Sequence, residues 1–468
     1  MITLHRNTPA ITPTSTTPDV VADQPRREPR YRVVGGSLAV GLAGALALCF
    51  GAFPGAEEYL ITGSALISFA VGWATLALLS SHFTSRAQRW AWVPAGFMAT
   101  VATIMFFTRP GDAALNKAGW VWPLCFFPLA IWMLVRVRRG FSGRVRWLLY
   151  PVVGAIALAS VGGMLETAVR AHDANAYPAP GELYDVGDYR LHLNCVGTGS
   201  PTVVLESGLG GTSAHWARIT EAVGHDTRVC AYDRAGQGWS DDGNGPQDSI
   251  AIADDLHILL QRAGEVGPFV LVGHSAGGAY VMTYASRYPD EVAGMVLLDS
   301  MSPYNFTILP DFESEYTMMR MGLGVGPSFA RLGIGQVVPK GFYSALPEPA
   351  ASQVKAFSSS PRTIRNMRDD QSMYRTALPQ AQALTSLGDK PLVVITATES
   401  LNKTKGWAAA QDQMAVLSTN SDHRIIESSH SGLLDEDGSY QASIEAISDV
   451  VIAVRSSGHV VGESSNNH

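Results

Sequence analysis

Five apolar stretches in the first third of the chain constrain its fold more than any other feature. They cover residues 33–53, 59–79, 90–107, 118–135 and 147–165, and none carries Asp, Glu or Arg in its interior. Each is about as long as the ~20 residues with which a helix crosses the hydrocarbon core of a bilayer. Five such stretches in succession predict a transmembrane region of five helices over residues 33–166.

Basic residues are unevenly distributed among the short loops between these stretches. Arginines are concentrated before the first stretch, between the second and third, and between the fourth and fifth. Since basic loops face the cytoplasm, we expect a cytoplasmic N-terminus. Five spans then place everything after about residue 167 outside the cytoplasm. A miscount of one span, most readily the fourth, would reverse this orientation.

Composition bounds the remaining segments. Charged residues make up only 16% of the chain, against about 25% in ordinary soluble proteins, because the apolar first third dilutes them. The net charge of -7 is mild for this length and argues against a nucleic-acid partner. Residues 1–32, rich in Thr, Pro and Arg, and residues 457–468 are expected to be disordered tails, and residues 167–181 a linker.

The pattern changes after residue 181. Short apolar segments with many β-branched residues alternate with helical segments, which predicts a mostly parallel, doubly wound α/β sheet over residues 182–456. The first two segments read as an antiparallel hairpin. Residues 301–389 interrupt the alternation without a convincing strand, and we expect them to form a helical cap over the strand ends.

The sequence Gly-His-Ser-Ala-Gly places Ser275 between Gly273 and Gly277. Such a match is weak by itself in a chain with 46 glycines. Here, however, an apolar strand precedes the serine and a helix follows it at once. A serine on so sharp a turn needs small neighbours, and the start of the helix offers free N–H groups to a developing negative charge. Ser275 is therefore a candidate nucleophile.

Three further segments carry a resemblance to a known family. Residues 205–216, LESGLGGTSAHW, resemble an oxyanion loop, with Ser207 where a histidine is usual. Residues 232–241, YDRAGQGWSD, resemble the Asp-x-Arg-Gly-x-Gly-x-Ser segment, with Ala235 for the first glycine. Residues 427–436, ESSHSGLLDE, resemble a late histidine segment. With the serine motif, they make residues 182–454 similar to α/β-hydrolase-fold proteins of the esterase and lipase-like superfamily.

The resemblance implies roles for individual residues. Ser275 would be the nucleophile and His430, last in the chain, its general base. The acid would be Asp299, at the end of an apolar strand; the alternative is Glu399, near the other position that the family uses. The amides of Ala276 and Leu209 would form the oxyanion hole.

Other polar residues near these motifs receive structural interpretations. His274 is expected to support the turn around Ser275. Asp233, which ends a strand, is expected to hold a loop together with Arg234.

The resemblance also brings two cysteines together. In this fold the second and fourth strands are neighbours, and Cys195 ends the second candidate strand while Cys230 lies within the fourth. We expect a disulfide between them, which would suit an extracytoplasmic domain; two buried free thiols are the alternative.

These features together predict a multi-pass membrane protein with an extracytoplasmic serine hydrolase domain. A serine nucleophile favours acyl transfer, and we expect hydrolysis of carboxylic esters, with lipid-like substrates favoured by the membrane and by the Met-rich residues 316–326. No metal or cofactor is needed. A peptidase or amidase on the same fold remains open, as does a catalytically inactive sensor or binding module.

Overall fold

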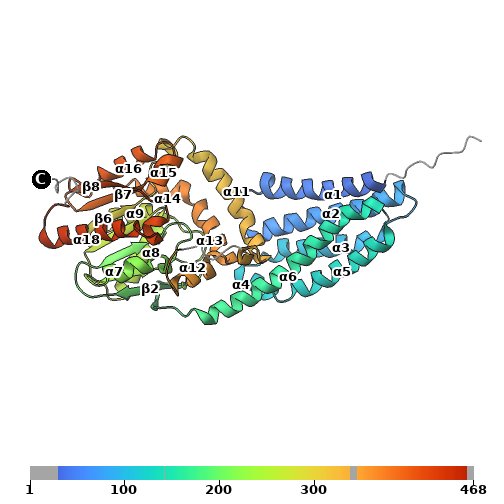
Figure 1. The fold of residues 1–468 in the computed structure, drawn as a ribbon, viewed down its shortest axis with the longest axis horizontal. Helices are drawn as coiled ribbons and strands as arrows, with labels where there is room; N and C mark the ends of the chain where they lie inside the picture. The colour runs from blue at the N-terminus through green and yellow to red at the C-terminus, as the bar shows by residue number, and fades with distance from the viewer. Residues whose placement is uncertain (1–29, 142, 338–344, 461–468) are drawn as a thin grey trace, which may run out of the picture.

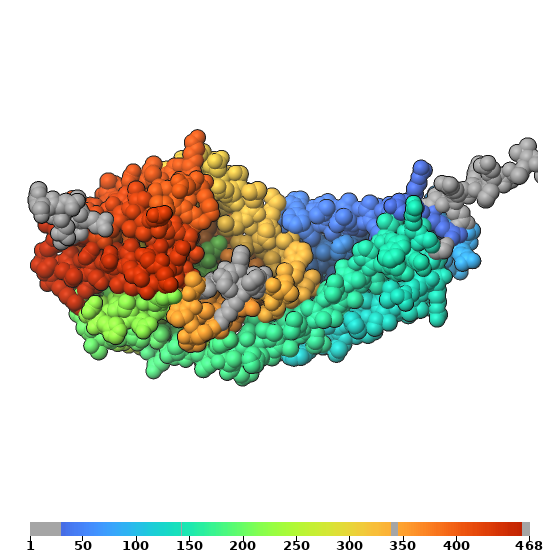
Figure 2. All heavy atoms as spheres, viewed as in Figure 1, coloured from blue at the N-terminus to red at the C-terminus, as the bar shows by residue number. Residues whose placement is uncertain are grey.

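The arrangement of the chain is elongated, with a helical bundle at one end, a sheet domain at the other and the cap between them (Figure 1). The computed structural model describes residues 30–141, 143–337 and 345–460. On the face drawn in Figure 2, cap atoms in yellow and orange fill the region between the blue and cyan bundle and the green and red sheet domain.

The bundle is built from the apolar first third. Its helices are α1 (Arg30–Leu46), α2 (Glu58–Phe83), α3 (Trp92–Thr108), α4 (Asp112–Ala118), α5 (Trp122–Gly140) and α6 (Arg146–Ala176), with short turns η1 (Ala47–Ala52), η2 (Arg89–Ala91) and η3 (Gly143–Val145). Four helical segments of the described chain are long and apolar enough to cross a membrane. The pair α4 and α5, bent by 47° at its break, is a fifth if it forms one span.

Small residues allow the first two helices of the bundle to pack closely. A Cβ at Gly72 of α2 would lie 3.0 Å from the carbonyl oxygen of Ser37 and 3.1 Å from Gly41 Cα on α1. Membrane helices commonly associate through such small residues. Moving an apolar side chain from lipid into a helix interface gains no hydrophobic free energy, so close backbone packing drives the association. The tight contact therefore fits a bundle that is surrounded by lipid.

The segment expected to be a linker is largely helical. Helix α6 continues beyond the apolar stretch to Ala176, so that only residues 177–181 connect it to the first strand. Arg170 explains the continuation, because it binds Glu166 at 3.0 Å and Asp173 at 2.9 Å. Ion pairs at these helical spacings stabilise the turns that carry them.

The sheet domain contains one eight-stranded sheet. Its strands are β1 (Glu182–Asp185), β2 (Arg190–Val196), β3 (Val203–Glu206), β4 (Val229–Tyr232), β5 (Phe269–His274), β6 (Val292–Leu298), β7 (Leu392–Ala397) and β8 (Ser421–Ile426). They lie in the order β1-β2-β4-β3-β5-β6-β7-β8. Strand β2 is antiparallel to β1 and β4, and the pairs from β4 to β8 are parallel. The predicted fold class is confirmed.

Helices cover both faces of this sheet, which explains why its central strands are apolar throughout. Val204 and Leu271 point into one buried cluster, while their neighbours Val203 and Val270 point into another. The helices that follow the first strands are α7 (Ala217–Val223), α8 (Ser249–Arg262) and α9 (Gly277–Arg287). Near the end of the chain come α15 (Thr398–Lys403), α16 (Trp407–Ala415), α17 (Gly432–Asp435) and α18 (Tyr440–Ser456), and the short turns are η4 (Ser213–Trp216) and η5 (Pro289–Glu291).

The cap is helical, as its lack of strand pattern predicts. It contains α10 (Asn305–Ile308), α11 (Phe312–Arg331), η6 (Ile334–Val337), α12 (Ala350–Ser358), α13 (Pro361–Ser372) and α14 (Tyr374–Ala381). Helix α11 reaches the bundle, where Ser328 shares a hydrogen bond of 2.8 Å with Thr62 of α2. Met318 and Met319 are 68% and 48% exposed, so they do not form the enclosed apolar wall expected from the Met-rich segment.

The two expected tails differ in how much of them the structure describes. Residues 1–29 and 461–468 lie outside the described residues. Arg30 to Arg32 belong to α1. At the other end, Val460 donates its amide hydrogen to Asn420 Oδ1 at 2.9 Å, so the chain after α18 first packs against the sheet domain.

Candidate active site

Ser275 lies on a strained turn between β5 and α9. Its φ angle is 56°, a conformation that is rare and costly for a residue other than glycine. The flanking glycines make the turn possible. A Cβ at Gly273 would lie 2.7 Å from Gly278 Cα, and one at Gly277 would lie 2.4 Å from the carbonyl oxygen of Glu206. The local sequence thus presents the hydroxyl of Ser275 at the carboxyl end of the sheet.

Two backbone amides next to Ser275 have no acceptor within the described chain. They belong to Ala276, directly after the serine, and to Leu209 in the loop after β3. Gly208 brings that loop close, since a Cβ there would lie 2.7 Å from Ser275 Cβ. Ser207 accepts a hydrogen bond of 2.8 Å from Trp216 Nε1 and so helps to hold the loop. The two amides are available to a negatively charged oxygen.

Asp299 and His430 are in direct contact. Asp299 Oδ2 lies 2.6 Å from His430 Nδ1, and the carboxylate is fully buried while the imidazole is 37% exposed. Burial by itself would raise the pKa of Asp299, but hydrogen bonds from His430, Ser400 and Trp407 hold that pKa below its usual value. The carboxylate therefore stays ionised and fixes the orientation of the imidazole.

Three donors that sequence reasoning did not identify complete the environment of Asp299. Ser400 Oγ donates to Oδ2 at 2.5 Å, Trp407 Nε1 donates to Oδ1 at 2.7 Å, and the Ala397 amide donates to Oδ1 at 3.2 Å. Like Ser275, Asp299 has a positive φ, 43°. The one available signal was Ser400 itself, which occupies the position where the family usually places its acid.

Glu399 and His274 contact the backbone of His430 and not its free ring nitrogen. Glu399 Oε2 accepts the amide hydrogen of His430 at 2.7 Å, and His274 Nε2 donates to the His430 carbonyl oxygen at 3.0 Å. Burial lowers the pKa of His274 to about 3, so this ring is neutral and holds the loop. Both residues position His430.

The hydroxyl of Ser275 and Nε2 of His430 form no hydrogen bond to each other or to another described residue. Catalytic hydrogen bonds are often long in ligand-free enzymes and tighten only when substrate binds. The geometry thus supplies an ordered imidazole and a half-buried serine on a strained turn.

Asp233 and Arg234 act separately. Asp233 binds His192 Nδ1 at 2.8 Å and accepts the amide hydrogen of Ser213 at 2.6 Å, so it does hold a loop. The expected partnership with Arg234 is wrong, because the guanidinium of Arg234 binds two other carboxylates. Arg234 is ion-paired with Glu206 at 2.6 Å and Asp370 at 3.1 Å.

Arg234 connects the oxyanion loop to the cap. It donates to the carbonyl oxygens of Ser207 at 2.6 Å and Gly208 at 2.9 Å, while its ion pair with Asp370 reaches helix α13. Met367 of the same helix packs against Gly210, where a Cβ would lie 2.7 Å from Met367 Sδ. One buried guanidinium thereby fixes the backbone that offers the Leu209 amide.

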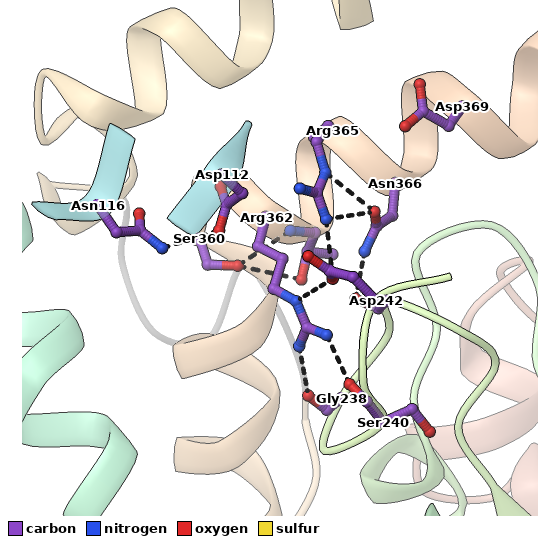
Figure 3. A network of polar contacts seen from close by, with 12 residues as sticks. Asp112, Asn116, Gly238, Ser240, Asp242, Ser360, Arg362, Arg365, Asn366 and Asp369 are labelled. Carbon is purple, nitrogen blue, oxygen red and sulfur yellow. Dashed lines mark hydrogen bonds and ion pairs between the residues drawn. The ribbon is translucent and has the colours of Figure 1, made fainter. Parts of the chain in front are cut away.

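Further polar contacts tie α13 to the loop after β4 (Figure 3). Arg362 donates to Asp242 at 2.8 Å and to the carbonyl oxygens of Gly238 and Ser240. Arg365 reaches the same Asp242 carboxylate at 2.9 Å. The cap helix therefore lies over the candidate site, held by contacts on two loops.

The two cysteines of the sheet domain are joined by a disulfide. Cys195 and Cys230 are directly opposite each other on β2 and β4. Together with Glu265 they make up the single group of potential metal ligands in the described ranges. Because each sulfur is already bonded to the other, this group does not offer thiolate ligands.

Comparison with known proteins identifies the family of this arrangement. The family model of the alpha/beta hydrolase fold matches residues 201–437, which contain Ser275, Asp299 and His430. The chain belongs to the alpha/beta hydrolase fold family. Among curated proteins, an uncharacterised protein of Schizosaccharomyces pombe is 30% identical over 306 residues, 58% of this chain and 56% of the relative. The chain thus spans about half the length of that relative.

Two further comparisons show weaker similarity. The uncharacterised protein YqjL of Bacillus subtilis is 28% identical over 138 residues, 29% of this chain and 54% of its own length. A solved structure, a thermophilic esterase of Thermogutta terrifontis, has a TM-score of 0.43 and 21% identity, and the match covers 57% of this chain and 94% of the esterase.

Proposed function

We propose that this chain is a membrane-anchored serine hydrolase that cleaves carboxylic esters with Ser275, His430 and Asp299. The observation that carries the proposal is the bond of 2.6 Å between the buried Asp299 carboxylate and His430 Nδ1, beside a serine with positive φ. This bond leaves Nε2 of the imidazole as the nitrogen that can accept a proton. Asp299 takes the role for which Glu399 was the alternative.

The proposed reaction follows from these positions. Ser275 Oγ attacks the ester carbonyl carbon as its proton passes to His430 Nε2. The carbonyl oxygen becomes negatively charged and accepts hydrogen bonds from the amides of Ala276 and Leu209. The C–O bond to the alcohol breaks, and the alcohol leaves with the proton from His430. Water then attacks the acyl carbon as its proton passes to His430. The bond to Ser275 Oγ breaks, His430 returns the proton to that oxygen, and the carboxylic acid leaves.

The proposed location is outside the cytoplasm. The loop arginines favour a cytoplasmic N-terminus, and five spans require that α4 and α5 count as one crossing. The disulfide between Cys195 and Cys230 is a second support, because disulfides persist in oxidising compartments.

A lipid-like ester is the substrate class that we favour. The carboxyl ends of the strands carry the candidate site, and the cap that covers this site packs directly on the bundle (Figure 1). Arg368 of α13, for example, donates to the carbonyl oxygen of Ala56 in the loop before α2. An ester with an apolar chain would be enriched where this surface meets the bilayer.

The experiment is a panel of esters and amides of increasing acyl length, assayed with the full-length protein in detergent. We expect hydrolysis of esters and its loss in Ser275→Ala, since that change removes the nucleophile and leaves the fold intact. Preferred hydrolysis of amides would replace the esterase proposal by a peptidase or amidase. Equal turnover by wild type and Ser275→Ala would refute the proposed nucleophile.

A further inference from the structure

The cap contacts the bundle at a level that lies inside two of the candidate membrane spans. At the end of α11, Ser328 shares a hydrogen bond of 2.8 Å with Thr62 of α2. Just after α11, the chain packs on α6, where a Cβ at Gly162 would lie 2.1 Å from the carbonyl oxygen of Leu332. Both Thr62 and Gly162 belong to apolar stretches that are long enough to cross a membrane. The cap therefore extends alongside segments that are expected to lie in lipid.

The backbone of Leu332 covers a strip of α6 that otherwise faces outward. Leu158 and Leu165 share one helix face with Gly162, since they lie one turn before it and one turn after it. Their side chains are 73% and 49% exposed. In a membrane, such leucines contact acyl chains. The cap thus occupies a place on α6 that lipid would otherwise fill.

The apolar side chains at this point of the cap are directed outward. Residues 329–334, which join α11 to η6, are called the cap corner below. Phe329 is 48% exposed and Ile334 is 47% exposed. Arg331 is the one charged residue between positions 321 and 337, and it is largely buried in ion pairs with α2 and α4. The outer surface of the cap corner is therefore apolar and uncharged.

Helix α11 changes in character along its length. Its first turn lies beside the sheet domain and carries the exposed carboxylates Glu313 and Glu315 (Figure 1). Its last turn lies against the bundle and exposes Phe329. Charged side chains are costly in hydrocarbon, whereas apolar side chains gain free energy when they leave water. This order of residues is the one expected for a helix that runs from water to a bilayer.

We propose that the cap corner inserts Phe329 and Ile334 into the bilayer, in the leaflet on the cap side. The partner surface is the apolar region just below the lipid headgroups, which interfacial helices enter to a depth of ~5–10 Å. The ion pairs of Arg331 with Glu58 and Asp112 hold the corner against the bundle at this level. The cap that covers the candidate active site is thereby bound to lipid as well as to the spans.

The test measures lipid contact by fluorescence quenching in the full-length protein. Phe329→Cys is made in a background with Cys49→Ala and Cys125→Ala, which removes the free cysteines. The variant is labelled with the fluorophore NBD and reconstituted into nanodiscs of dioleoylphosphatidylcholine. A phosphatidylcholine with a nitroxide on its acyl chain should quench NBD strongly, whereas iodide, which stays in water, should quench it weakly. Ile334→Cys, the second site of the cap corner, should give the same result.

Two further positions calibrate the quenching. Met318 lies on the same face of α11 as Phe329, three turns earlier and about 16 Å along the axis. NBD at Met318→Cys should be quenched by iodide and not by the nitroxide lipid, and Leu158→Cys on α6 should show the opposite pattern.

Equal quenching of Phe329→Cys and Met318→Cys by iodide would overturn the proposal. Weak quenching of Phe329→Cys by both reagents would also overturn it, because another protein surface, such as a second copy of the chain, would then cover the cap corner. Since the readout is contact with lipid, neither result bears on ester hydrolysis.

Discussion

At the scale of single residues, the candidate site depends on how buried groups hold one exposed imidazole. Asp299 binds Nδ1, while Glu399 and His274 bind the backbone on either side of the ring. The ring is thereby fixed at both its nitrogen and its main chain. Substitutions of these residues should have separable effects on chemistry and on stability.

Asp299→Asn should lower kcat by about 10⁴-fold, since an amide stabilises the wrong tautomer of a triad histidine. Glu399→Gln should lower kcat far less, because it touches only the backbone amide of His430. Steady-state turnover of the two purified variants on one ester compares them directly. The reverse order would assign the acid to Glu399.

The pH dependence of the protein's stability should depend on the titration of His274. The folded pKa of His274 is about 3, below the ~6.5 of an unfolded histidine. Between these two pH values the unfolded chain therefore binds more protons than the folded chain. The stability that neutral His274 contributes is complete above pH ~6.5 and is lost progressively as the pH falls towards about 3. His274→Gln removes this titration.

Thermal melts of wild type and His274→Gln at intervals from pH 7.5 to pH 4.5 measure that effect. The Tm of wild type should fall more steeply with decreasing pH than that of the variant. Parallel curves for the two proteins would show that His274 does not titrate in this manner.

At the scale of elements, sequence periodicity predicted the strands and helices of the sheet domain but not the contacts between them. Central strands such as β5 are buried on both faces and therefore read as continuous apolar runs. Local composition did not predict that α6 continues to Ala176, where Arg170 is ion-paired with Glu166 and Asp173. Hydrogen bonds such as that from Trp407 to Asp299 join residues 108 positions apart, and no local pattern contains them.

The disulfide between β2 and β4 should stabilise the sheet domain. It closes a loop with a sequence separation of 35, for which the chain-entropy model gives about 4 kcal/mol. The double substitution Cys195→Ala and Cys230→Ala should lower the Tm and leave the reaction of Ser275 with a fluorophosphonate intact. The matched control is Cys49→Ala, which removes a free cysteine of the bundle and no disulfide. An unchanged Tm in the double variant would contradict the structural role of the bridge.

At the scale of the whole molecule, an ion cluster joins the bundle to the cap. Arg331 of α11 binds Glu58 of α2 and Asp112 of α4, and all three side chains are largely buried. Since removal of one partner leaves the other charges buried and unpaired, Arg331→Met should destabilise the protein by roughly 3–5 kcal/mol. Combining it with Glu58→Gln and Asp112→Asn should recover part of the loss in a thermal melt. Equal Tm values for Arg331→Met and wild type would exclude a structural role for this cluster.

The orientation in the membrane is also a property of the whole chain. In intact cells, a membrane-impermeant maleimide should label Glu221→Cys, in the sheet domain, but should label Arg86→Cys, in the loop after α2, only after lysis. Wild type provides the background of the two free cysteines. The opposite pattern would place the sheet domain in the cytoplasm. Equal accessibility of both cysteines in intact cells would show that α4 and α5 do not form one crossing.

The central claim is that Ser275 is a nucleophile activated by His430, and covalent labelling with a fluorophosphonate tests it most directly. The intact mass of the full-length protein should increase by one adduct, peptide mapping should place the adduct on Ser275, and Ser275→Ala should remain unlabelled. Labelling should be much slower in His430→Ala, because the base is lost. Folded wild-type protein without an adduct, or an adduct on another serine, would contradict the account.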